Sequence, residues 1–407
     1  MDQKRLEAYA DLIVKKGLNL DKGQEVLLIA GLDQVEFVRM TVEKCYQAGA
    51  AKVVVNWTDM ATEKLDPIYQ TEETLSEVES WVLAKWQWRA DKLPALLWLD
   101  SDDPDGMDGV DQGKRSRAQM ARFPKIKPFR EATENRHQWC IAGVPGKEWA
   151  MKVFPGIPAE EAIEKLWEAI LAAARANGDG IANWDKHNAL IHSRCAALNK
   201  YNFARLEYKS SNGTDFSVGL MEQGVFAGAA EKDLSGRVFN PNIPSEEIFT
   251  TPKKGDAEGI LYSSKPLSWQ GTLIEDFSIR FEKGKAVEVK AARGQEALEK
   301  MISMDEGAPY LGECALIDYN SPINRSGILF YCTLFDENAS CHMALGRGFY
   351  DCIENYSAYS QEEMKAMGVN DSMIHVDFMI GSEDMDITGI TPEGERIAIF
   401  RKGCWCF

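Results

Sequence analysis

The sequence predicts two domains, an α/β amino-terminal domain over residues 1–185 and a β-rich α+β carboxy-terminal domain over residues 186–407 that carries a metal site. The length of 407 residues exceeds what one compact core usually holds. The first half alternates short apolar runs with amphipathic helical stretches, a pattern typical of α/β domains. Beyond Ala204 strand patterns dominate, which predicts a change of architecture near residue 185.

The first domain begins with a β-α-β unit. The apolar run 26–30 (VLLIA) lies between two glycines and predicts a buried strand. Asp33 then caps a helical stretch that ends near Gly49, and 51–57 (AKVVVNW) predicts the next strand. Further elements are expected as strands at 95–100 and 139–144 and as a helix at 158–177.

The second domain begins with a predicted hairpin. The strands RLEYKSS and DFSVGL flank Asn212 and Gly213, a pair that favours a tight turn. Further strands are expected at GILYSS, GTLIEDFSIRFEKGKAVEVKA, GILFYCTLF (327–335), IHVDFMI, DITGITPEG and RIAIF.

Composition excludes several classes of partner. The 46 basic and 63 acidic residues give a formal charge of −17, which repels nucleic acid and anionic lipid, so neither is an expected partner. The amino terminus is a charged amphipathic helix without the apolar core of a signal peptide, and no run is apolar over the roughly 18 residues a membrane span needs. Nine cysteines without a CxxC pair indicate free thiols. We therefore expect a cytoplasmic protein.

A histidine and an aspartate lie two residues apart in one predicted strand. His375 and Asp377 point to the same face of MIHVDFM, while their apolar neighbours pack the other face. Such a pair must be hydrogen-bonded or must bind a cation, because leaving it buried and unpaired is costly. This segment alone leaves both interpretations open.

Three more residues extend the pattern. His342 lies in a polar run after GILFYCTLF, Glu313 enters an apolar strand, and Glu247 follows Pro244 and Ser245. Each glutamate by itself fits a solvated or capping residue. Two Glu, two His and one Asp together suit a dinuclear hydrolase site for zinc, cobalt or manganese. The other histidines fit surface or satisfied polar positions: His137, His187 and His192.

The stretches PSEEIFTTP, LGECALI, SPINRSGILFYCTLFDENASCHMALG and HVDFMIG resemble the aminopeptidase T/aminopeptidase S family of metallo-aminopeptidases, and the resemblance covers nearly the whole chain. It implies a homodimer with two divalent ions per chain (zinc, cobalt, manganese or magnesium), acting through a metal-activated water on short peptides with a free N-terminus. It also implies that a glutamate such as Glu313 is catalytic, bridging the ions or carrying a proton. The implied metal ligands are Glu247, Glu313, His342, His375 and Asp377.

One position departs from the family pattern. The family places a catalytic tyrosine in HxALGxxY, where this chain has Phe349, with Tyr350 one residue later. We expect a local shift to bring the Tyr350 hydroxyl to the site as a second oxyanion donor.

Two alternatives belong to other functional classes. Distantly similar proteins are iron-dependent ring-cleaving dioxygenases, but a mononuclear iron triad needs neither Glu247 nor Glu313. A non-catalytic peptide-binding or metal-storing dimer is the other alternative, and only Phe349 favours it.

Overall fold

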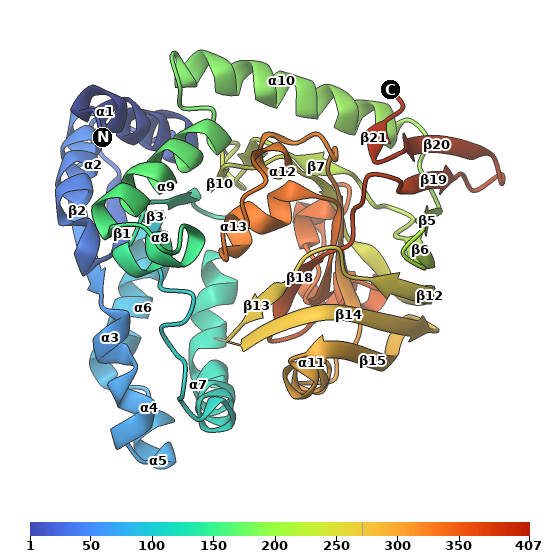
Figure 1. The fold of residues 1–407 in the computed structure, drawn as a ribbon, viewed down its shortest axis with the longest axis horizontal. Coiled ribbons are helices and arrows are strands. Elements are labelled where there is room, and N and C mark those ends of the chain that lie inside the picture. Colours follow the sequence, from blue (N-terminus) through green and yellow to red (C-terminus); the bar gives the residue numbers. More distant parts are fainter. Residues whose placement is uncertain (271) are drawn as a thin grey trace. The chain divides into compact units, whose positions relative to one another are not determined.

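The computed structural model describes every residue except Gly271, and the chain divides into two compact units (Figure 1). The first unit comprises Met1–Asp185 and Ala230–Pro244, and the second comprises Lys186–Ala229 and Ser245–Phe407. The two-domain division from sequence placed residues 230–244 in the second domain. They group with the first unit because β10 (Asn242–Ile243) pairs in parallel with β4 (Trp139–Gly143).

The first unit is built on a five-stranded parallel sheet, which confirms its α/β class. The apolar runs 26–30, 95–100 and 139–144 form its three inner strands, because a strand covered on both faces of the sheet needs a continuously apolar sequence, and the run 51–57 forms an edge strand. In spatial order the strands are β10, β4, β3 (Ala95–Asp100), β1 (Glu25–Gly31) and β2 (Lys52–Thr58). A small hairpin joins β8 (Glu231–Lys232) and β9 (Val238–Phe239).

Aromatic packing ties three helices of this unit together. Phe37 lies 5.7 Å from Tyr9 and 5.3 Å from Trp167 between ring centroids, and all three rings are buried. These rings come from α2 (Val35–Gln47), α1 (Gln3–Leu12) and α9 (Ala159–Ala173). The other α-helices are α3 (Met60–Glu63), α4 (Leu65–Tyr69), α5 (Glu72–Leu75), α6 (Ser80–Lys92), α7 (Gln112–Thr133) and α8 (Lys147–Val153). The helix α10 (Gly180–Asn199) contains the boundary between the units.

The second unit contains two antiparallel sheets, which confirms the β-rich class. The smaller one, hereafter the ligand sheet, consists in spatial order of β18 (His375–Met379), β17 (His342–Gly346), β16 (Leu311–Leu316), β11 (Ile248–Thr250) and β7 (Ala227–Gly228).

The larger sheet has nine strands and contains the predicted hairpin of β5 (Arg205–Lys209) and β6 (Asp215–Leu220). Side chains of both sheets share one apolar core, because Phe378 of β18 packs 6.0 Å from Phe277 of β14 between ring centroids. The remaining strands are β12 (Pro252–Tyr262), β13 (Leu267–Trp269), β14 (Thr272–Glu282), β15 (Lys285–Arg293), β19 (Asp386–Ile390), β20 (Arg396–Arg401) and β21 (Cys404–Trp405).

One predicted strand is wrong. The run 327–335 forms a loop followed by the short helix α13 (Thr333–Asp336). The Asp336 carboxylate accepts hydrogen bonds from the backbone N–H groups of Phe330 (2.8 Å) and Cys332 (3.1 Å). These bonds satisfy within the loop the donors that a strand would offer to a neighbour.

Three other helices complete the second unit: α11 (Gln295–Ile302), α12 (Pro322–Ser326) and α14 (Gln361–Met367). Among the described residues of the chain, no helix has the length and apolar character needed to cross a bilayer.

Candidate metal centre

Strand register places the predicted ligands on one face of the ligand sheet. Glu313 on β16 lies opposite Ala344 on β17, and Ala344 lies opposite Asp377 on β18, so these three side chains share a face. His342 and His375 each lie two residues from a member of this row and therefore share the face as well. The small side chain of Ala344 leaves space between the carboxylates.

Glu247 joins the same group from the residue just before β11, which pairs with β16. Its Oε2 lies 3.5 Å from His342 Nε2. From the same imidazole nitrogen, Glu313 Oε1 is 4.0 Å away and Asp377 Oδ1 is 3.9 Å away. His375 Nε2 lies 3.1 Å from Glu313 Oε2 and 3.4 Å from Asp377 Oδ1. The structure thus brings together all five residues that the sequence predicted as ligands.

Backbone carbonyls orient both imidazoles. His342 Nδ1 is 2.9 Å from the carbonyl oxygen of Glu337, and His375 Nδ1 is 2.7 Å from that of Arg347. Each carbonyl accepts a hydrogen bond from Nδ1–H, which fixes the tautomer and leaves Nε2 directed at the carboxylates. This is how metal-binding histidines are commonly held.

The charges of the five predicted ligands strongly affect one another's pKa values. Burial and the negative charges of Asp377 and Glu247 raise the pKa of Glu313 to about 7. Burial disfavours the charged form of His342, but Glu247, Glu313 and Asp377 outweigh it and raise its pKa to about 10. The pKa of His375 is raised in the same way, and its charge lowers the pKa of Asp377 to about 2 although burial opposes this. Without metal, protonated imidazoles balance the carboxylates.

The residues fit a pair of divalent ions. Ligand atoms of Glu247, Glu313 and His342 lie within 4.8 Å of one another, and so do those of Glu313, His375 and Asp377. Glu313 belongs to both groups. Asp377 Oδ1 is buried and, among the described residues, has no hydrogen-bond partner besides the ion pair with His375 at 3.4 Å, so it can accept a bond to a cation. Imidazole with carboxylate is a donor set suited to zinc, cobalt and manganese.

Glu337 also lies at this site, although the sequence did not predict it. This carboxyl has its pKa raised well above the usual range by burial and by the charges of Asp377 and Glu247, so it lies in the same electrostatic field. Its backbone also orients His342. Its place five residues before His342 in a polar run was the available signal, but a glutamate in a loop resembles a solvated residue.

Phe349 contacts His375, one of the predicted ligands. The Phe349 ring lies 4.8 Å from the His375 ring between centroids, and its backbone N–H donates to Thr251 Oγ1 at 2.8 Å. The Tyr350 ring packs in a separate buried cluster with Met221, Ile353, Met364 and Val369. The local shift and the catalytic role expected of Tyr350 from the sequence stay predictions.

With this geometry established, comparison with known proteins identifies the family. Residues 2–405 match the model of the thermophilic metalloprotease family, M29. The chain belongs to this family. It is therefore a metalloprotease, a hydrolase of peptide bonds.

Relatives extend over the full length. The chain is 41% identical to aminopeptidase AmpS of Bacillus subtilis over 99% of this chain and 98% of that protein. It is 40% identical to aminopeptidase T of Thermus thermophilus with the same coverage. The solved structure of wild-type AmpT from Thermus thermophilus matches with a TM-score of 0.90 and 39% identity over 100% of both chains.

A second solved structure shares the fold alone. The 2,5-dihydroxypyridine dioxygenase of Pseudomonas putida KT2440 matches with a TM-score of 0.51 over 98% of this chain and 96% of that one, but only 12% of residues are identical. Family membership therefore favours the peptidase over the dioxygenase alternative.

Proposed function

We propose that the metalloprotease is a dinuclear aminopeptidase that removes the first residue from short peptides with a free N-terminus. The observation that supports this most is that Glu313 belongs to both groups of ligand residues. One of its oxygens faces His342 and the other faces His375. A carboxylate placed in this way can bridge two ions, with Glu247 and His342 completing one site and His375 and Asp377 the other.

The ligand residues also explain the proposed chemistry. Two divalent ions bound there would lower the pKa of a shared water and polarise the scissile carbonyl. The surrounding carboxylates attract the positively charged α-amino group of the substrate. An interior peptide bond has no such group beside it, so only the first peptide bond is favoured. The apolar contact of Phe349 with His375 helps exclude water from that side.

The test is amino-acid release from matched peptides that differ only in N-acetylation. Protein stripped with a chelator is reloaded with zinc, cobalt, manganese or magnesium, and bound metal is counted by mass spectrometry. We expect cleavage of the free peptides alone, with about two ions bound per chain. Equal cleavage of the acetylated peptides would overturn the aminopeptidase, and full activity with about one ion per chain would overturn the dinuclear mechanism.

We further propose a homodimer. Large apolar side chains of the first unit are exposed on α4 and α6: Tyr69 at 81%, Trp81 at 68%, Ile68 at 49% and Leu65 at 48%. Large exposed apolar side chains are a common feature of interaction surfaces. Sedimentation equilibrium should give twice the chain mass of 45.6 kDa, and a Trp81→Glu substitution should shift the equilibrium toward monomer.

A cytoplasmic location is also proposed. All nine cysteines are free thiols, which suits a reducing compartment. Fractionation of the source cells with a cytoplasmic marker enzyme tests this.

A further inference from the structure

Two fully buried asparagines lie in the segments that orient the imidazoles of the metal centre. Asn338 follows Glu337, whose carbonyl oxygen lies 2.9 Å from His342 Nδ1. Asn370 lies in the loop that leads into β18, where His375 is the first residue. Both asparagines are 0% exposed. Because burying an amide is costly unless it is hydrogen-bonded, the partners of these two side chains indicate what each amide does.

Asn338 connects two segments that carry ligands. Its Oδ1 accepts a hydrogen bond from the backbone N–H of Glu246 at 2.7 Å, and its Nδ2 donates to the carbonyl oxygen of Leu334 at 2.9 Å. Glu246 directly precedes Glu247, one of the predicted ligands. One side chain thus connects the backbone at Glu247 with the turn that orients His342.

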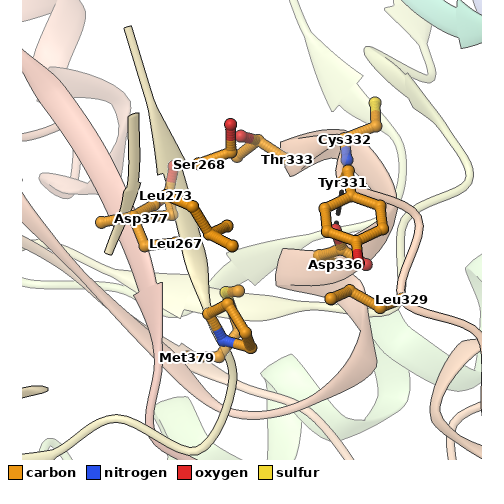
Figure 2. A pocket seen from close by; sticks show the side chains of 11 residues that line it. Leu267, Ser268, Leu273, Leu329, Tyr331, Cys332, Thr333, Asp336, Asp377 and Met379 are labelled. Carbon is orange, nitrogen blue, oxygen red and sulfur yellow. Dashed lines mark hydrogen bonds between the residues drawn. The ribbon is translucent and has the colours of Figure 1, made fainter. Parts of the chain in front are cut away.

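The loop before Asn338 makes hydrogen bonds of its own. The Asp336 carboxylate accepts the N–H groups of Phe330 and Cys332, and Figure 2 draws the bond to Cys332 as a dashed line. The same view shows Asp336 and Asp377 on opposite sides of a hollow. Because the loop satisfies its own backbone donors, Asn338 has a fixed backbone position from which it can hold its partners in place.

Asn370 holds both neighbours of Arg347. Its Nδ2 donates to the carbonyl oxygen of Gly346 at 2.6 Å, and its own carbonyl oxygen accepts the N–H of Gly348 at 2.9 Å. The residue between these glycines, Arg347, accepts a hydrogen bond from His375 Nδ1 at 2.7 Å. The hydrogen bonds of Asn370 therefore fix the backbone segment whose carbonyl orients His375.

Two details show why position 370 carries an amide and why the Arg347 carbonyl has little room to move. Asn370 Oδ1 is buried and has no hydrogen-bond partner among the described residues, so an apolar side chain would fill the same space at a lower cost. The donors of the amide, which also reach the carbonyl oxygen of Gly307 at 2.8 Å, therefore explain its presence. A Cβ added at Gly312 on β16 would lie 2.1 Å from the Arg347 oxygen, so that oxygen packs directly against the strand that carries Glu313.

We infer that Asn338 and Asn370 are positioning residues, each of which orients the ligands of one ion. Asn338 acts on Glu247 and His342, and Asn370 acts on His375, in both cases through backbone groups. The inference rests on the proposed dinuclear function, because only then do the two groups of ligands bind separate ions. It predicts that the affinity for either ion can be lowered while the other ion stays bound.

The test measures the two affinities separately. Metal-stripped protein is titrated with Co²⁺ in competition with a chelating dye, and the cobalt-shifted imidazole N–H resonances are followed by NMR. The chain has five histidines, so the resonances of His342 and His375 can be assigned by their loss in His342→Gln and His375→Gln. The wild type should bind two ions and show both resonances.

Asn338→Ala and Asn370→Ala serve as controls for each other, because each removes one fully buried amide from the second unit. Asn338→Ala should weaken the binding of the ion assigned to His342 about tenfold or more, while the affinity for the ion assigned to His375 stays within about twofold. Asn370→Ala should do the reverse by the same amounts. A residue that only stabilises the fold would lower both affinities alike.

Further substitutions keep the test decisive if an alanine variant does not fold. Asn338→Leu and Asn370→Leu fill the volume and still remove the amide. Gly312→Ala displaces the Arg347 carbonyl instead, so it should weaken the same ion as Asn370→Ala.

The outcomes separate this inference from the function on which it rests. A wild-type protein that binds two ions, with variants that weaken both ions alike, neither ion or the opposite ion, would overturn the positioning roles and leave the dinuclear centre intact. Failure of both the alanine and the leucine variant at either position to fold would also overturn them, because the amide would then hold the whole unit. A wild-type protein that binds about one ion per chain would overturn the dinuclear function and this inference with it.

Discussion

Carboxylates gather in both units, but their surroundings differ. In the first unit Asp102 follows β3 and feels the charges of Asp100, Glu63 and Asp33. Desolvation and these like charges raise the pKa of Asp102 to about 7, while its side chain stays exposed. In the second unit the buried imidazole of His342 and the partly buried imidazole of His375, each fixed by a carbonyl oxygen, face the carboxylates.

This difference indicates which features distinguish a metal centre from other groups of acidic residues. The carboxyl end of a parallel sheet is the usual place for a ligand, yet the oriented imidazoles lie on the antiparallel ligand sheet. Asp102 can relieve its repulsion by taking up a proton from water. Asp377 does not take up a proton in this way, because the charge of His375 lowers its pKa to about 2 although burial opposes this. Fixed histidines together with a buried carboxylate therefore distinguish the site.

The largest effect is expected from a substitution of Glu313, which tests the difference between the two groups of carboxylates. Glu313→Gln should lower kcat/KM more than about 1,000-fold, since metal ions contribute several kcal/mol to transition-state stabilisation and each 1.4 kcal/mol is about tenfold. Steady-state kinetics and metal counting on the purified variant provide the measurement. The bound metal should also fall, because both ligand groups use this carboxylate.

The control is Asp102→Asn, which removes a carboxylate of the first unit. Activity should stay within about twofold of wild type, as expected for an exposed position. Comparable losses in the two variants would show that the two clusters do not differ as proposed.

The second prediction concerns pH. Protonated His342 stabilises the metal-free fold fully below its ordinary pKa of 6.5, and this contribution is lost as the pH rises through about 10. Metal-free protein should therefore lose about 2–3 kcal/mol of unfolding free energy between about pH 7.5 and 9.5, measured by urea denaturation. Glu313 acts in the same direction at lower pH, because its raised pKa means that the folded state binds more protons.

Bound metal should reverse this trend. Metal requires neutral imidazoles and ionised carboxylates, so the stabilisation by zinc should grow as the pH rises. The Asp102→Asn variant should show the wild-type slope above pH 7.5, because its group titrates lower. A flat metal-free profile would contradict the coupling of His342 to the carboxylates.

The third prediction tests the tyrosine. Tyr350→Phe should keep kcat within about twofold of wild type, because the ring lies in a separate apolar cluster. Phe349→Tyr should raise kcat by about tenfold or more if its hydroxyl reaches the developing oxyanion, since one such donor is commonly worth 10²–10³-fold. A loss of about 100-fold in Tyr350→Phe would instead establish the catalytic role predicted from the sequence.

The last prediction concerns a residue that supports His375. Asp305 accepts hydrogen bonds from Ser372 Oγ (2.9 Å) and from the backbone N–H of Met373 (2.6 Å), just before the strand that carries His375. Asp305→Ala should weaken metal binding about tenfold, as loss of a supporting contact typically does. Competition with a chelating dye gives the affinity. Unchanged affinity would show that β18 holds His375 without this support.

Much of the fold could be predicted from sequence where the pattern is local. Continuous apolar runs identified β1 and β3, and Asn212-Gly213 identified the hairpin of β5 and β6. The run 327–335 was wrongly predicted as a strand because it is as apolar as one. Its backbone forms a loop because Asp336 accepts its N–H groups. The return of residues 230–244 to the first unit depends on long-range pairing, which local patterns do not contain.

The candidate site could be predicted as a set of residues but not as a geometry. Spacing showed that His375 and Asp377 share a face, and the resemblance supplied Glu247, Glu313 and His342. The register that aligns Glu313 with Asp377 through Ala344 is set by pairing between distant strands, so no local pattern contains it. The place of Glu337 at the site and the contact of Phe349 with His375 could not be predicted either, because both depend on segments that are distant in the sequence.

The carbonyls that orient His342 and His375 belong to the main chain, at Glu337 and Arg347. In many metalloenzymes the corresponding partner is a side chain that one mutation can delete. Here no exchange of side chain at position 337 or 347 removes the acceptor itself. Substitutions at these two positions can change the charge and shape around the ions while both imidazoles keep their orientation. The reactivity of the site can therefore change before metal binding is lost.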